Sequence, residues 1–199
     1  MILTTRPYAA GRRFRSGAGL LLLGFLAAGC GQPASTPPGS DQIQPTYDPG
    51  TGKLTRISYD SNDDGKHDTW AFMDGARLVK LEADENQDGR VDRWEYYPTT
   101  TEGGVKQPPE RIERSTRFDG KVSRREFFEG GVMVRVEEDT DGDGRVDKWE
   151  TYSDGTLTVL ALDTKGSGKP DRRLVYAADG TLDRIEEDPD GSGHFRVAK

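Results

Sequence analysis

Acidic residues recur at fixed intervals in several short segments of this 199-residue chain. In the clearest segment, residues 139–150 read DTDGDGRVDKWE, with carboxylates at the first, third, fifth and ninth positions and a glycine at the sixth. Such side chains can converge on one point if the chain wraps around it, and the glycine permits the sharp turn. Ca²⁺ takes about six to eight hard oxygen ligands, whereas Mg²⁺ prefers a rigid octahedron that keeps several waters. The spacing therefore predicts a Ca²⁺ site.

Three segments supply a nearly full set of candidate oxygen ligands. Each set consists of the side chains at positions one, three, five and nine and the backbone carbonyl at position seven. In two segments a glutamate at position twelve is added. The candidates are Asp139, Asp141, Asp143, Arg145, Asp147 and Glu150; Asp84, Asn86, Asp88, Arg90, Asp92 and Glu95; and Asp60, Asn62, Asp64, Lys66 and Asp68, with Ala71 in place of the glutamate.

The twelve-residue pattern resembles the calcium loop of EF-hand proteins. EF-hand loops lie between helices, however, and the segments that flank these loops read as strands. The closer resemblance is to the DxDxDGxxD loops in the β-hairpins of integrin-type propeller (FG-GAP) repeats, whose repeats are much longer. In that family the ninth position completes the site. The resemblance therefore leaves open whether Glu95 and Glu150 bind the ion or are ordinary strand residues.

Three further copies of the acidic segment have lost ligands. The copy that starts at Asp163 has Lys165 at its third position, where a positive charge would repel a cation, and the copy that starts at Asp188 has Arg196 at its ninth position. The copy around Asp119 lacks the first ligands and predicts only a turn. For the whole set the alternative is that Asp, Asn and Gly are simply favourable turn formers. A plain turn does not, however, require acids at four fixed positions.

The acidic segments belong to a repeat that positions them. Their aligned glycines are spaced by 24, 31, 24, 24 and 25 residues, and the long interval contains an insert at 98–110. Most periods contain a second turn, such as Asp154-Gly155, and the segments between turns are about eight residues long and rich in β-branched and aromatic residues. Residues 54–199 are therefore predicted to be all-β: an antiparallel β-meander of about six tandem hairpin repeats and twelve strands, in a single curled or solenoid-like sheet.

The three tryptophans, Trp70, Trp94 and Trp149, fall at the same position of the repeat. Alternation along a strand puts them on one face of the sheet. Such a ladder of tryptophans is explained either by packing between repeats or by an aromatic strip that binds carbohydrate, and the sequence leaves both interpretations open.

Residues 1–29 read as a secretory signal, because four arginines and no acid precede an apolar run at 20–29 that is too short to span a bilayer. The run ends in Ala27-Ala28-Gly29-Cys30, which resembles the lipobox of bacterial lipoproteins. That resemblance implies cleavage before Cys30 and a palmitate-type lipid anchor on it, and Gly31 after the cysteine implies the outer membrane of a cell envelope. An ordinary signal peptide cleaved nearby is the alternative.

Composition limits the remaining classes of function. Residues 30–53 are rich in Pro, Gly, Ser and Thr and predict a flexible tether. Without residues 1–29 the chain has 24 basic and 35 acidic residues, a net charge of −11, which argues against nucleic acid as a partner. Only 32% of the residues are hydrophobic, so we expect a thin core.

The sequence therefore predicts a non-enzymatic, Ca²⁺-binding lipoprotein of the cell envelope, held at a membrane by its N-terminal lipid. Bacterial lipoproteins with tandem DGxxDxWEYY repeats are similar over residues 54–199, and this resemblance implies no defined activity. The alternative is an adhesion or glycan-binding module that uses the tryptophans, with a protein or glycan partner on the repeat face. No nucleophile elbow, HExxH motif or phosphate loop favours an enzyme.

Overall fold

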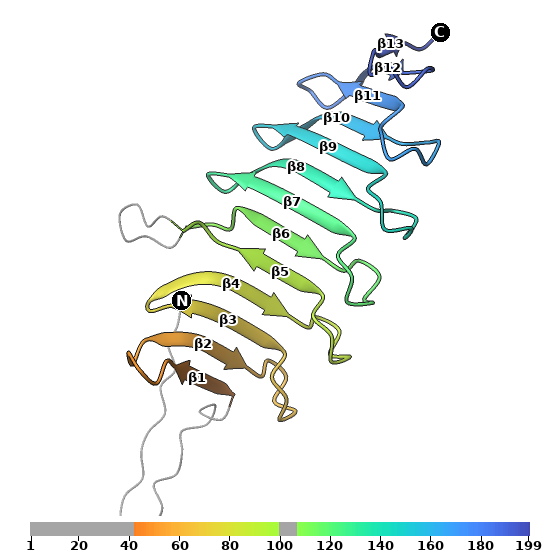
Figure 1. Cartoon of the computed structure of the whole chain (residues 1–199). Helices are drawn as coiled ribbons and strands as arrows, with labels where there is room; N and C mark the ends of the chain where they lie inside the picture. Colours follow the sequence, from red (N-terminus) through yellow and green to blue (C-terminus); the bar gives the residue numbers. More distant parts are fainter. Residues whose placement is uncertain (1–41, 100–106) are drawn as a thin grey trace, which may run out of the picture. The chain divides into compact units, whose positions relative to one another are not determined.

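The computed structural model describes residues 42–99 and 107–199, which form one antiparallel sheet of thirteen strands. Each strand pairs with its neighbours in sequence, and the sheet does not close on itself (Figure 1). The predicted all-β meander is thus confirmed. The strands are β1 Ile43–Tyr47, β2 Leu54–Tyr59, β3 Thr69–Asp74, β4 Arg77–Ala83, β5 Arg93–Tyr96, β6 Arg111–Arg114, β7 Arg124–Glu129, β8 Val132–Glu138, β9 Lys148–Ser153, β10 Thr156–Leu162, β11 Arg172–Tyr176, β12 Leu182–Glu187 and β13 Arg196–Val197.

Two kinds of connection alternate along the sheet. The odd-numbered strands are followed by tight turns, except β5, which is followed by a longer segment. The even-numbered strands are followed by acidic loops. Because neighbouring strands are antiparallel, all six loops lie at the same end of the strands (Figure 1). In chain order we call them the first (60–68), second (84–92), third (115–123), fourth (139–147), fifth (163–171) and sixth (188–195) loop. The sheet thus gathers the candidate ligands along one side.

The turns at the opposite end use the residues that tight hairpins require. Asp154 and Gly155, between β9 and β10, have φ values of 50° and 76°, as expected for a type I′ turn. The strands that flank this turn change register beside it, between Leu157 and Val159. Such an irregularity increases the local twist of a strand pair.

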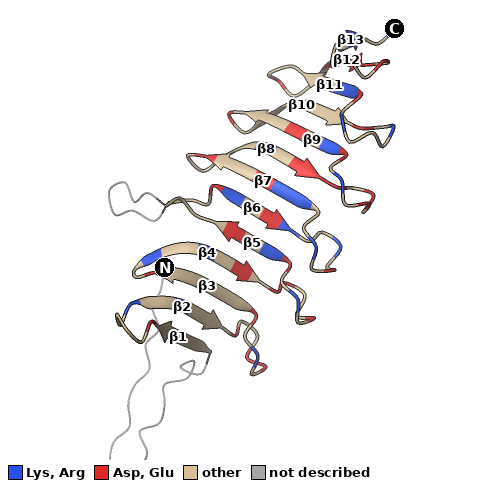
Figure 2. Ribbon diagram, viewed as in Figure 1, with Lys and Arg blue, Asp and Glu red and all other residues tan. Residues whose placement is uncertain are grey.

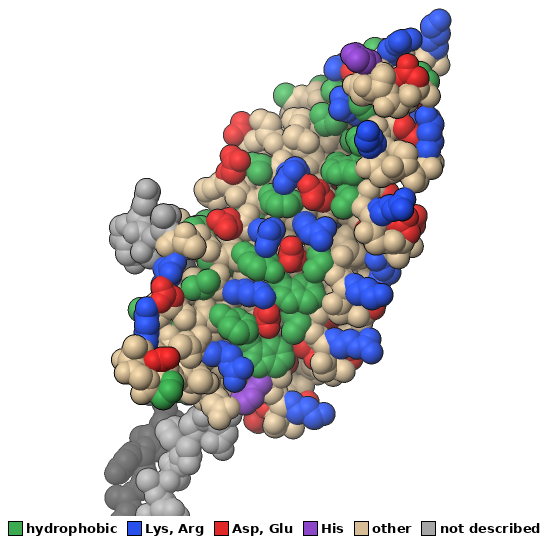
Figure 3. Space-filling model, in the orientation of Figure 1, with side chains coloured by type: hydrophobic (Ala, Val, Ile, Leu, Met, Phe, Trp, Pro, Cys, Tyr) green, Lys and Arg blue, Asp and Glu red, His purple; other side chains and the backbone are tan. Residues whose placement is uncertain are grey.

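A single layer of strands leaves little of the chain buried. Among the described residues only three hydrophobic side chains are buried, those of Ile112, Val136 and Ala161. Eleven buried residues are polar or charged, and seven of them are aspartates of the loops. Figure 3 shows hydrophobic side chains in a band along one face, with charged side chains among them. The loops, rather than an apolar core, therefore contain many of the best-enclosed side chains.

The tryptophans share one cross-strand row, but they do not form a continuous stack. Trp70 of β3 pairs with Glu82 of β4, and Glu82 pairs with Trp94 of β5. Strands two apart are separated by about 9.6 Å. An acidic side chain therefore separates Trp70 from Trp94.

The sheet begins earlier than we expected. Strand β1 lies inside the predicted tether and adds a thirteenth strand. Pro45 lacks an N–H donor, which is tolerated because β1 is an edge strand. The predicted signal peptide, Cys30 and most of the tether lie outside the described residues. Within the described ranges, no helix is long and apolar enough to cross a membrane.

Candidate metal-binding loops

The six loops share one backbone conformation. The glycine at the sixth position has a positive φ in every loop, between 75° and 90°. The fourth position is also left-handed, with φ between 56° and 86°. Glycine provides this conformation in the last three loops, whereas Asp63, Gln87 and Phe118 adopt it in the first three. The acidic pattern in the sequence predicts the turn at the sixth position but not the one at the fourth.

The first-position side chain caps each loop from inside. In all six loops it accepts a hydrogen bond from the N–H of the sixth-position glycine, over 2.5–3.2 Å. Third- and fifth-position side chains cap the backbone two residues further on. In the fourth loop Asp141 accepts from the N–H of Asp143 at 3.0 Å, and Asp143 from that of Arg145 at 2.8 Å. Asn62, Asp64 and Lys66, and likewise Asn86, Asp88 and Arg90, repeat this arrangement. The predicted ligands therefore also stabilise the turn.

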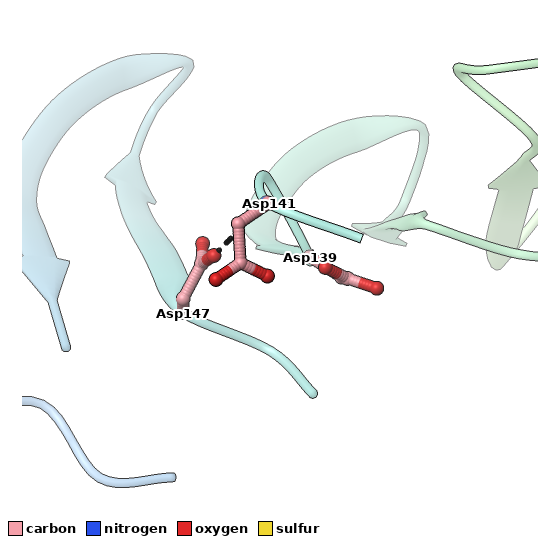
Figure 4. A group of neighbouring side chains, drawn as sticks. All are labelled: Asp139, Asp141 and Asp147. Carbon is pink, nitrogen blue, oxygen red and sulfur yellow. Dashed lines mark hydrogen bonds between the residues drawn. The ribbon is translucent and has the colours of Figure 1, made fainter. Parts of the chain in front are cut away.

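The fourth loop brings three carboxylates together. Oxygens of Asp139, Asp141 and Asp147 lie within 4.8 Å of one another, a group that could hold a metal ion (Figure 4). Asp139 is buried, Asp147 half-buried and Asp141 exposed. Asp143 is not part of this group, and in the described part of the chain no other loop assembles three acidic ligand atoms so closely. Acidic residues mark this and other loops in Figure 2.

An arginine of the neighbouring loop contacts the same site. Arg117 stands at the third position of the third loop, and its guanidinium donates to the carbonyl of Asp139 at 3.0 Å and to the Asp139 carboxylate at 3.3 Å. Burial raises the pKa of Asp139, but the N–H groups of Gly142 and Gly144 and the arginine outweigh that effect and hold the pKa below its ordinary value. A protein cation thus already lies beside the fourth loop.

In the second loop, Asp92 is enclosed without a partner. Its side chain is 1% exposed, and neither carboxylate oxygen accepts a hydrogen bond. Burial raises the pKa of Asp92, and the carboxylates of Asp88 and Asp84 add to that rise. The N–H groups of Asn86 and Glu85 oppose it without reaching hydrogen-bond geometry.

The first loop satisfies the equivalent carboxylate fully. Asp68 accepts hydrogen bonds from the Ser61 N–H at 2.9 Å, the Ser61 hydroxyl at 2.6 Å and the Thr69 hydroxyl at 2.9 Å. Burial raises the pKa of Asp68, but these donors more than compensate and lower it overall. Asp60 is buried opposite and caps Gly65.

The third loop carries out the same backbone capping without buried acids. Ser115 replaces the first aspartate and accepts from the N–H groups of Asp119 and Gly120 at 3.1 and 3.2 Å. Ser123 replaces the ninth and accepts from the Thr116 N–H at 2.9 Å. A pattern of acids does not reveal these two serines, but their distances in sequence from Gly120 match those of the first and ninth aspartates in the other loops.

In the fifth loop, the lysine at the third position contacts both its own loop and the next one. Lys165 Nζ lies 3.9 Å from a carboxylate oxygen of Asp171 and donates to the carbonyl of Pro189 in the sixth loop at 3.4 Å. The lysine thus places a positive charge beside the ninth-position carboxylate, where it would repel a cation.

Glu95 and Glu150 lie in strands β5 and β9, and the three-carboxylate group does not include them. Glu150 accepts from the Tyr152 hydroxyl at 2.8 Å and pairs with Lys148 at 2.8 Å. Burial and this hydrogen bond raise the pKa of Tyr152 to about 12. Glu95 is likewise engaged, by Tyr97 and by Arg93. In this structure both glutamates are therefore engaged by neighbouring strand side chains.

Comparisons with known proteins do not assign these loops to a family. No family model matches the chain, and no curated protein is significantly similar in sequence.

A hollow of about 550 Å³ lies on one face of the sheet, beside Trp149. Val159, Ala161 and Val175 contribute apolar surface to it, and Arg135, Arg173 and Arg184 contribute charge. Arg135 also stacks over Phe127, with its guanidinium carbon 4.0 Å from the ring centre. Among the described residues, this hollow is the surface that most resembles a binding site built around a tryptophan.

Proposed function

We propose that this protein is a non-enzymatic calcium-binding protein in which Ca²⁺ stabilises the tandem hairpins. The observation that carries the proposal is the convergence of Asp139, Asp141 and Asp147 within 4.8 Å in a loop of matching sequence. Three like charges so close repel one another and favour the open loop. A bound cation would turn that repulsion into ligation and hold β8 and β9 together.

Comparison with the third loop indicates that the carboxylates of the other loops do more than form the turn. With Ser115 and Ser123 it keeps the same capping hydrogen bonds. Turn geometry therefore does not require carboxylates at positions one and nine. Buried charges are costly unless they are paired or bind a metal. Retaining buried aspartates at both positions in the first and second loops is thus best explained by a cation.

The chemistry of the donors favours calcium over other metals. Every candidate ligand is a carboxylate, an amide or a backbone carbonyl oxygen, and the loops contain no sulfur ligand. Oxygen-only sites suit Mg²⁺, Ca²⁺ and Mn²⁺. An irregular loop with many donors suits the variable coordination of Ca²⁺.

Thermal unfolding with Ca²⁺ and with EDTA tests this proposal. At a free Ca²⁺ concentration of about 100 times the Kd, one site should stabilise the protein by about 2.7 kcal/mol. Asp139→Ala together with Asp141→Ala should remove the part of the stabilisation that the fourth loop contributes. Asp163→Ala is the matched control and should leave it intact, because the charge of Lys165 beside Asp171 already disfavours a cation in the fifth loop. Equal melting temperatures of the wild type in Ca²⁺ and EDTA would contradict the proposal.

We also propose that the protein is anchored in a bacterial cell envelope, at the outer membrane, by a lipid on Cys30. Support comes from the Ala27-Ala28-Gly29-Cys30 sequence and from the lack of any other cysteine. Cys30→Ser should release the protein from membranes and remove the acyl mass. Unchanged membrane retention in this variant would reject the anchor.

Glycan binding is the second candidate function, and the hollow beside Trp149 favours it. Sugar-dependent quenching of tryptophan fluorescence that disappears in Trp149→Phe, and persists in Trp70→Phe, would support it. Quenching that is the same in both variants would not.

A further inference from the structure

The loops differ in how they satisfy the carboxylate at the ninth position. In the fourth loop, the Thr140 hydroxyl donates to Asp147 at 2.8 Å, and in the fifth, the Thr164 hydroxyl donates to Asp171 at 2.8 Å. In the first loop, the Ser61 hydroxyl donates to Asp68 at 2.6 Å. In each of these loops the hydroxyl belongs to the second position, so the ninth carboxylate has a donor of its own.

The second loop lacks this hydroxyl. Its second position is Glu85, whose carboxylate lies 3.4 Å from Arg93 and 3.5 Å from Arg114 and points to those strands. Asp92 is consequently left 1% exposed with both oxygens unpartnered. No other aspartate oxygen in the described ranges is both buried and without a partner.

Asp92 also faces other acids of its loop. Asp84 and Asp88 both repel its negative charge. A carboxylate only accepts hydrogen bonds, so Asp84, which accepts the N–H groups of Asp88 and Gly89 at 3.2 and 2.7 Å, has no donor to offer Asp92. A cation placed between these carboxylates would satisfy Asp92 and remove the repulsion.

We infer that the second loop is the tightest of the calcium sites and fills first, and that the residue at the second position of each loop sets this order. The inference rests on the proposed function. A second-position hydroxyl competes with the ion, because its hydrogen bond must be weakened before the carboxylate can bind the metal. In the second loop the ion displaces no such donor, and it relieves a buried, unpartnered charge.

Calorimetric titration of the full chain with Ca²⁺, after removal of bound metal with EDTA, tests the order of filling. Asp92→Asn should abolish the tightest binding step. Glu85→Thr, which supplies a hydroxyl, should weaken that step by about tenfold. Glu85→Val has the shape of threonine without the hydroxyl and should leave the step as in the wild type. Thr140→Val should tighten the step of the fourth loop.

The outcomes separate this inference from the proposed function. If Glu85→Thr and Glu85→Val bind Ca²⁺ equally, or if Asp92→Asn keeps the tightest step, the order of filling is wrong although calcium binding stands. If the wild type binds no Ca²⁺, the proposed function itself fails. Melting in EDTA gives an independent measurement, in which Glu85→Thr should be more stable than Glu85→Val because it satisfies Asp92.

Discussion

Single residues of the loops are chosen for backbone conformation as well as for charge. The fourth position is left-handed in every loop, yet three loops place a residue with a side chain there. For a residue other than glycine this conformation costs roughly 1–2 kcal/mol. Phe118 is the least favourable of the three, because it has no short polar side chain to make a local hydrogen bond, and it is 45% exposed.

Phe118→Gly should therefore stabilise the protein by up to about 1 kcal/mol, since the relief of strain exceeds the entropic cost of glycine. Urea unfolding measures the change. Gly144→Ala is the matched control: its φ is 89° with open space around it, so alanine should be destabilising for conformational rather than steric reasons. A less stable Phe118→Gly variant would show that the phenyl ring packs usefully in the loop.

At the end of the sheet that carries the tight turns, the charge of Asp74 contributes to stability in a way that depends on pH. Asp74 accepts from Lys53 and from Arg77, at 2.5 Å for the latter, and these donors lower its pKa from 3.8 to about 2. A lowered pKa in the folded state stabilises the protein above the ordinary pKa of Asp, and this contribution disappears as the pH falls through about 2. Asp74→Asn should thus lower the melting temperature at pH 7 and have little effect near pH 2. An equal effect at both pH values would assign the loss to packing.

At the scale of the elements, adjacent loops are joined by the backbone. The N–H of Asp84 donates to the carbonyl of Asp68 at 2.8 Å, and that of Asp163 donates to Asp147 at 2.8 Å. The ninth position of one loop is therefore bonded to the first position of the next. An ion that orders the end of one loop should also order the beginning of its neighbour.

Arg117 adds a side-chain link between the third and fourth loops. Arg117→Gln should destabilise the protein by about 1 kcal/mol in EDTA. The loss should be smaller with Ca²⁺, because the ion then neutralises Asp139 in place of the guanidinium. Arg125→Gln is the control: Arg125 pairs with Glu113 within the sheet, at 3.4 Å, and its effect should not depend on Ca²⁺. Equal Ca²⁺ dependence of the two variants would contradict this role of Arg117.

Local features of the sequence predicted the secondary-structure elements. The sequence did not predict the contacts between residues that are far apart along the chain. Turn spacing predicted the strands. The acidic pattern pointed to the fourth loop, where three carboxylates converge, but also to the first and second loops, where no such group forms among the described residues. Strand β1 was missed because Pro45 and its polar neighbours resemble a tether until an edge of the sheet is known. The partners of Asp139 and the isolation of Asp92 depend on residues brought together only by strand pairing, such as Arg117, 22 positions away.

At the scale of the whole sheet, the described strands contact only their neighbours in sequence. Stability in such an array is approximately a sum of repeat and nearest-neighbour contributions. No strand depends on a distant partner, so one complete period should be removable. Lys148 and Arg172 both follow directly after the ninth position of a loop, and both start a strand that runs in the same direction.

Deletion of residues 148–171, which contain β9, β10 and the fifth loop, should therefore leave a folded sheet in which β11 pairs with β8. Circular dichroism should keep its β-type shape, and the urea m-value should fall by about 15%, in proportion to the chain removed from residues 42–199. Deletion of only residues 148–155 removes a single strand and its turn. It forces β10 to run in the opposite direction and carries the fifth loop to the turn side, so this shorter deletion should be the more damaging one. If instead the 24-residue deletion unfolds the protein, contacts beyond nearest neighbours hold the sheet together.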